Sequence, residues 1–203
     1  MLQHLYNRRQ TPKIGDGVGT TTKLTFEDFV KLPGEPGKHF ELDRGELIAE
    51  PSPTYLHNRI RFRIARHLDD FVQQHRLGGV TQENDFRLAP DIVRNPDVAF
   101  IATGTLNRMD LTRSPIEGVP SLAIEVVSPA NSAQDMFTKV HQYLDAGCQA
   151  VWVFYPNAKV VVIHDFNGMR EVAAPAALEE KRLFGDKAYS LPLTSIFDED
   201  LIK

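Results

Sequence analysis

The stretch that decides the fold is residues 121–128, SLAIEVVS, an almost unbroken apolar strand with one acidic residue inside it. A strand that is apolar at successive positions is typical of a sheet covered on both faces. Alternation places Glu125 on the same face as Ala123 and Val127. A buried carboxylate is costly unless a positive charge neutralises it. We therefore expect either a divalent cation or a Lys or Arg side chain beside Glu125.

The segments around this stretch carry helical and strand periodicity. Apolar residues three or four apart predict a helix over 54–75, ended by Gly78-Gly79, and a second helix over 132–146 with Ser132 as its N-cap. Strands are predicted over 39–43, 46–50, 80–88, 96–102, 121–128, 149–155 and 159–166. This order predicts an α/β fold with a mixed central sheet flanked by helices, an N-terminal β-hairpin and extra C-terminal strands.

Composition limits the class of protein. The 203 residues predict one domain, 24–203, after a flexible glycine-rich arm over 1–23. The single cysteine, Cys148, excludes an intrachain disulfide and is consistent with a cytoplasmic location. No apolar run has the length of a membrane helix, so no membrane partner is expected. The net charge of -4 excludes nucleic-acid binding through bulk charge alone, which leaves a local basic patch or a bound metal ion.

Two carboxylates are the main candidates for chemistry. Asp97 enters the predicted strand 96–102, and it converges with Glu125 if the two strands are neighbours. Such an oxygen-rich pair suits Mg²⁺ or Mn²⁺ better than zinc, and the backbone carbonyl of Val126 would add a third ligand. Each acid also has an ordinary explanation, as a turn aspartate or as half of a buried ion pair.

Three further side chains are weaker candidates. Lys139 lies at the edge of an apolar helix stripe and can aim its ammonium at the two acids, or simply pair with Asp135 in solvent. His57, in the first turn of the helix 54–75, and Glu46, after the hairpin turn Arg44-Gly45, would complete a metal shell or orient a water. Without such a role, His57 is a core-boundary residue and Glu46 is a surface residue.

A basic stripe runs along the first long helix. Arg59, Arg63 and Arg66 are spaced i, i+4 and i+7, so they share one face. That face either contacts the phosphates of a nucleic acid or is simply solvated.

Several of these motifs, taken in order, resemble one family. They are Pro96-Asp97, then Glu125-Val126-Val127-Ser128-Pro129, then Asp135, Lys139 and Tyr143, then Ala150-Val151-Trp152-Val153. Together they resemble the Uma-type family, a restriction-endonuclease-like group of the PD-(D/E)XK nuclease superfamily. The hairpin 41–47 and the helix beginning near His57 resemble its N-terminal signature, and the resemblance spans about residues 24–200.

The resemblance implies a restriction-endonuclease-like core and a metal-dependent endonuclease. Asp97 matches the aspartate of the superfamily motif and Glu125 its second acid, but Val127 stands where the motif has lysine. In the family that lysine moves to the following helix, where Lys139 is the match. The resemblance further implies Mg²⁺ (or Mn²⁺), a nucleic-acid substrate, most directly double-stranded DNA, and cutting as a homodimer.

Two alternatives remain open on the sequence alone. The absent strand lysine is consistent with a catalytically silent binding or assembly module that keeps the nuclease fold. An active metal site could also act on RNA or on a small phosphoester.

Overall fold

A six-stranded mixed sheet forms the centre of the structure, a computed structural model that describes residues 23–35, 38–50 and 52–197. The strand order is β11-β10-β9-β8-β6-β3. The predicted decisive strand is β8 (Leu122–Val126), which is antiparallel to β6 (Val98–Ala102) and parallel to β9 (Ala150–Tyr155). The outer strands are β3 (Gly78–Gln82), β10 (Val160–Asp165) and β11 (Gly168–Ala173). The predicted mixed central sheet is confirmed.

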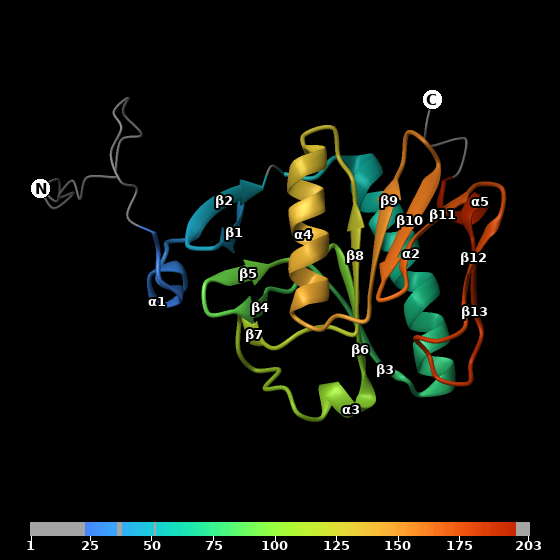
Figure 1. Cartoon of the computed structure of the whole chain (residues 1–203), viewed down its shortest axis with the longest axis horizontal. Coiled ribbons are helices and arrows are strands. Elements are labelled where there is room, and N and C mark those ends of the chain that lie inside the picture. The colour runs from blue at the N-terminus through green and yellow to red at the C-terminus, as the bar shows by residue number, and fades with distance from the viewer. Residues whose placement is uncertain (1–22, 36–37, 51, 198–203) are drawn as a thin grey trace, which may run out of the picture.

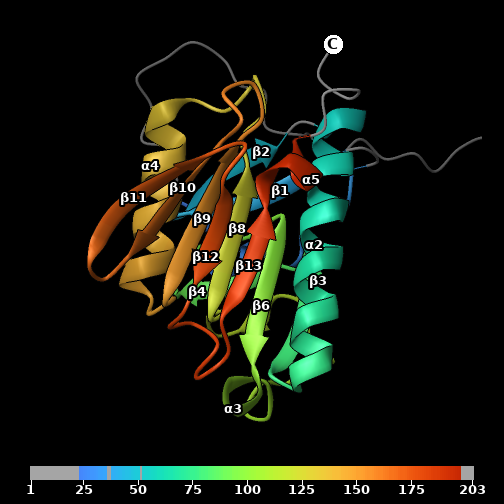
Figure 2. The ribbon, with the colours of Figure 1, turned by 90° about the vertical axis from the view of Figure 1, so that its right-hand side faces the viewer.

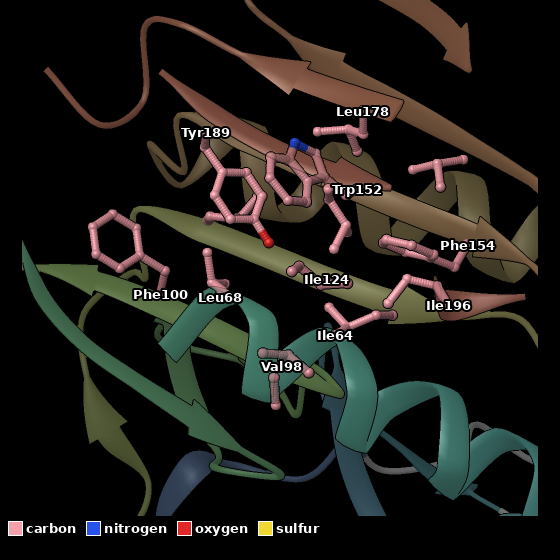
Figure 3. Close-up of a cluster of buried hydrophobic side chains, with 14 of the residues drawn as sticks. Ile64, Leu68, Val98, Phe100, Ile124, Trp152, Phe154, Leu178, Tyr189 and Ile196 are labelled. Carbon is pink, nitrogen blue, oxygen red and sulfur yellow. The ribbon is translucent and has the colours of Figure 1, made fainter. Parts of the chain in front are cut away.

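Two long helices cover opposite faces of this sheet, as Figures 1 and 2 show for α2 (Tyr55–His75) and α4 (Ala133–Asp145). The α2 face holds the larger core, in which Ile64 and Leu68 pack near Ile124 and Trp152 (Figure 3). The extra C-terminal elements close this core: β12 (Ala177–Glu180), β13 (Tyr189–Pro192) and the short helix α5 (Leu193–Ile196). The α4 face holds a smaller core, which includes Ala123, Val151 and Val153.

The N-terminal hairpin belongs to a second sheet of order β2-β1-β5-β4-β7. Its strands are β1 (His39–Asp43), β2 (Glu46–Glu50), β4 (Phe86–Ala89), β5 (Ile92–Arg94) and β7 (Ile116–Glu117). The predicted single strand 80–88 is therefore wrong, because β3 and β4 lie in different sheets. Glu83, between them, has a φ of 51°, a left-handed conformation that ends the first strand before the second begins.

Local capping signals set the helix boundaries. The Thr54 hydroxyl accepts a hydrogen bond from the backbone N–H of His57, and the Ser132 hydroxyl accepts one from Asp135. Thr25 caps the short helix α1 (Phe26–Phe29) in the same way, and α3 is the single turn Thr103–Leu106. The end of α2 differs from the prediction. The chain turns at Arg76, whose φ is 54°, and Gly78 and Gly79 do not end the helix but are the first two residues of β3.

Two expectations concern the chain as a whole. Among the described residues, no helix has the length and apolar character needed to cross a bilayer. The predicted arm over 1–23 falls almost wholly outside the described residues, so the domain boundaries stay a prediction.

Gly78 provides a test of the junction between α2 and the sheet. It adopts a φ of 150°, and a Cβ atom there would lie 2.0 Å from the carbonyl oxygen of Ile101. We expect Gly78→Ala to destabilise the fold by at least about 2 kcal/mol and to lower Tm by roughly 4–8 °C. In Gly79→Ala the new Cβ would meet Leu106 at an ordinary 3.6 Å, so the free energy of unfolding should change by less than about 1 kcal/mol. Equal melting temperatures for the two variants would contradict this account.

Candidate active site

A cavity of about 270 Å³ opens where β8 ends, and the predicted residues Asp97, Glu125, Val126, Lys139 and His57 all line it. They come from the entry to β6, from β8, from α4 and from the first turn of α2. The β6–β8 register pairs Val98 with Ile124, and one further step along it sets Asp97 opposite Glu125. Side chains directly opposite on antiparallel strands have Cβ atoms about 4.5–5.5 Å apart. The predicted convergence of the two acids is thus present in the geometry.

Both carboxylate oxygens of Asp97 are held by neighbours. The backbone N–H of Val126 donates to Oδ2 at 2.7 Å, and Nε2 of His57 lies 2.7 Å from Oδ1. The other ring nitrogen of His57, Nδ1, is buried and has no hydrogen-bond partner among the described residues. His57 and β8 together fix the direction in which Asp97 faces the cavity.

Glu125 is buried and carries the most perturbed carboxyl group of the cavity. Burial is the main cause that raises its pKa to about 8, and the carboxylates of Asp97 and Glu41 add to this against the opposing charge of Lys139. The hydroxyl of Tyr143 donates to Oε1 of Glu125 at 3.0 Å. A cation bound between Asp97 and Glu125 would oppose both causes of the raised pKa, burial and the neighbouring carboxylates, because it favours the ionised form of a buried carboxyl group.

Lys139 is buried as well, on the inner face of α4. Its Nζ lies 3.1 Å from Oε2 of Glu41 and 3.0 Å from Oε1 of Glu50. Burial alone would lower the pKa of Lys139, but the charges of Glu125, Glu41 and Glu50 outweigh burial and hold the pKa above its ordinary value. The surrounding carboxylates therefore favour the charged form of the ammonium, and the two that contact it come from the hairpin.

A buried arginine that was not predicted from the sequence completes this arrangement. Arg94, at the end of β5, donates to Oε2 of Glu41 at 2.7 Å and to Oδ2 of Asp43 at 2.8 Å. Its Nε donates to Oε1 of Gln142 on α4 at 2.7 Å. Glu41 thus lies between two cations, Arg94 and Lys139, and links the second sheet to the cavity.

Glu46 does not reach the cavity. It is exposed at the start of β2 and pairs in register with Asp43. Glu50, four residues further along the same face of the strand and therefore about 13 Å away, lines the cavity instead. The hairpin contributes an acid to the site, as expected, but from its far end.

The arginine stripe lies on another side of α2. Arg59, Arg63 and Arg66 line a separate hollow of about 350 Å³. At 3.6 residues per turn they lie roughly 180–240° around the helix from His57. Arg63 donates to the carbonyl of Ile196 at 3.4 Å, and Arg66 lies 3.9 Å from Asp70. Phosphate contacts by these residues stay a prediction, but they would not be made inside the Asp97–Glu125 cavity.

The donor atoms decide which metal suits the cavity. Among the described residues, no group of three or more His, Cys, Asp and Glu side chains is arranged to hold a metal ion. Asp97 and Glu125 nevertheless supply two hard carboxylates on one wall, beside the backbone of Val126. Mg²⁺ in proteins is commonly held by one or two carboxylates and keeps several waters, so this donor set fits Mg²⁺ or Mn²⁺ and not a zinc site of nitrogen and sulfur ligands.

The raised pKa of Glu125 gives a pH-dependent stability in the metal-free protein. An exposed glutamate ionises near pH 4.5 and Glu125 near pH 8, so its contribution to stability is complete below pH 4.5 and is lost as the pH rises through 8. Glu125→Gln keeps the shape without the charge. We expect the free energy of unfolding of this variant, measured in urea with EDTA, to exceed that of the wild type by about 2 kcal/mol at pH 8.5 and by much less at pH 5.5.

The exposed Glu46→Gln serves as the control for this measurement, because its charge is in solvent in both states. An equal effect of Glu125→Gln at the two pH values would show that Glu125 does not titrate as its surroundings require.

Comparisons with known proteins support the mixed α/β fold described above. Among solved structures, the chain is similar to "a putative nuclease belonging to DUF820 from Anabaena variabilis ATCC 29413", with a TM-score of 0.75, 19% sequence identity, and coverage of 89% of this chain and 99% of that one. No curated protein matches the chain. Residues 26–185 match the Uma2 family, which is described as "Putative restriction endonuclease". Since that match spans most of the sequence, the chain belongs to the Uma2 family.

Proposed function

We propose that the chain is a metal-dependent endonuclease that hydrolyses phosphodiester bonds in DNA. The description of its family supports a nuclease role. One observation carries the proposal: Asp97, Glu125 and Lys139, which are distant in sequence, line the same cavity at the end of β8. Two acids and a buried ammonium at one point are what phosphodiester hydrolysis requires, namely cation ligands and a fixed positive charge.

Asp97 and Glu125 are the residues that would hold Mg²⁺ or Mn²⁺, with the carbonyl of Val126 as a further ligand. A bound divalent cation would neutralise phosphate charge and lower the pKa of a bound water. The hydrogen bonds from Val126 and His57 engage one lone pair on each oxygen of Asp97 and leave others for ligation. His57 therefore acts through Asp97, as a positioning residue, and its buried Nδ1 is not placed to take a proton from water.

Lys139 would stabilise the negative charge that develops on the phosphate oxygens. Glu41 and Glu50 hold its ammonium at the cavity wall, so the charge is in place before substrate arrives. Tyr143 orients Glu125 from the same helix. The absence of lysine at position 127 does not remove the cation from the site, because α4 supplies one.

Other expectations rest on the superfamily and stay predictions. They are double-stranded DNA as the substrate and a homodimer as the cutting species. A cytoplasmic location, expected from the single cysteine, also stays a prediction. Cutting both strands of a duplex is the reason to expect a second copy.

The direct test is cleavage of supercoiled plasmid and of circular single-stranded DNA by the purified protein with Mg²⁺ or Mn²⁺. We expect the wild type to cut, EDTA to abolish cutting, and Asp97→Asn and Glu125→Gln each to slow it at least about 100-fold, since loss of an outer partner of a metal ligand alone costs 10–100-fold. Glu46→Gln, outside the cavity, should cut like the wild type.

Titration calorimetry with Mn²⁺ separates this function from the silent binding module. Binding that is lost in Asp97→Asn supports a working metal site. Absence of both Mn²⁺ binding and cutting in the wild type would overturn the nuclease proposal and favour the silent module.

A further inference from the structure

A second cleft, of about 430 Å³, opens directly beside the Asp97–Glu125 cavity. The two share a wall made of residues from the start of α2 and the loop after β8: Thr54, His57, Ser128, Pro129 and Asn131. The remaining walls of the second cleft are Leu56, Val127, Tyr155, Pro156, Asn157 and Ala158. A ligand held in the first cavity is therefore adjacent to the second.

Strand order explains why the two hollows adjoin. The cavity lies beyond the carboxyl end of β8, and the cleft lies beyond the carboxyl end of β9, at Tyr155. These strands are parallel neighbours in the sheet. Carboxyl ends of parallel strands are where α/β sheets bind ligands, so one extended ligand can follow this edge.

The chemistry of the cleft differs from that of the cavity. Among the described residues that line it there is no Asp, Glu, Lys or Arg. Leu56, Val127 and Pro156 give apolar walls, and the partly buried ring of Tyr155 gives an aromatic one. Such a surface does not suit a second phosphate, which would need cations, but it suits a flat, weakly polar ring.

A side-chain amide adds a fixed polar group at the wall between the two hollows. Oδ1 of Asn131 accepts hydrogen bonds from the backbone N–H of Ser128 at 2.8 Å and from its hydroxyl at 2.9 Å. The backbone donor fixes which end of the amide is oxygen, so Nδ2 carries the N–H donors. Asn157 lies in the same cleft. Amide groups of this kind form hydrogen bonds with the edges of nucleobases.

We propose that this cleft holds the nucleobase of a nucleotide next to the scissile phosphate. The inference rests on the proposed nuclease function, because the phosphate in the first cavity is what places a base in the second. In a B-form duplex each base is stacked and out of reach, so the substrate is a strand that presents an unstacked base. The preferred substrate class is thus single-stranded nucleic acid, or a duplex from which one base is extruded.

The test compares binding of two labelled strands of equal length and charge, one of about twelve thymidines and one of abasic residues, by fluorescence anisotropy in Ca²⁺. We expect the wild type to bind the thymidine strand about 10-fold more tightly, since stacking of a base on an aromatic ring strengthens binding by at least this much. Tyr155→Ala should lose most of this preference and Tyr155→Phe should keep it. Phe166→Ala, at an aromatic residue 85% exposed and outside the cleft, is the matched control.

Equal binding of the two strands by the wild type, or an undiminished preference in Tyr155→Ala, would overturn the base site. If the wild type cuts plasmid yet shows no base preference, the nuclease function stands and only the base site fails. If it shows the preference and cuts nothing, the nuclease function fails and base binding stands. A uridine strand and a deoxyuridine strand, which differ only in the sugar, identify the preferred sugar, and base-dependent binding of either one supports the proposal.

Discussion

The burial of one acidic side chain, Glu125, on the α4 face of the central sheet is the constraint on which the rest of the site depends. The charge of Lys139 opposes the rise in the pKa of Glu125, but Lys139 is itself buried and is held by Glu41 and Glu50. Glu41 in turn is shared with Arg94, which bonds to α4 through Gln142. One acid in β8 therefore accounts for a series of charges that joins the second sheet, the central sheet and α4.

Such a network is a poor way to gain stability. Desolvating charges in an interior is often no better than packing apolar residues of similar volume, while removing a single partner costs about 3–5 kcal/mol. The network does fix the position of the Lys139 ammonium, because Glu41 and Glu50 hold it at the cavity wall. This favours a chemical role for Lys139 over a structural one, because an apolar residue would serve packing equally well.

The sequence predicts what is local and misses what depends on docking. Thr54 and Ser132 mark helix starts by their own hydrogen bonds, and the placement of Asp97 near Glu125 follows from alternation once β6 and β8 are neighbours. Glu41 could not be found in this way, because a strand that alternates polar and apolar residues is typical of a half-exposed sheet. That polar face becomes interior because Lys139 and Gln142 of α4, together with Arg94, contact it in the folded protein.

Val127, which stands where the superfamily motif has lysine, is also part of the wall of the second cleft. A lysine at position 127 would project from the loop after β8, where Val127 now forms part of an apolar wall. With the cation on α4, none of the described residues that line the cleft at the ends of β8 and β9 is Asp, Glu, Lys or Arg, while Lys139 still lines the cavity. Under the proposed function, a lysine on the helix instead of the strand would do more than supply a charge: it would leave an uncharged surface beside the cavity, where a base would be accommodated without displacing a hydrated cation.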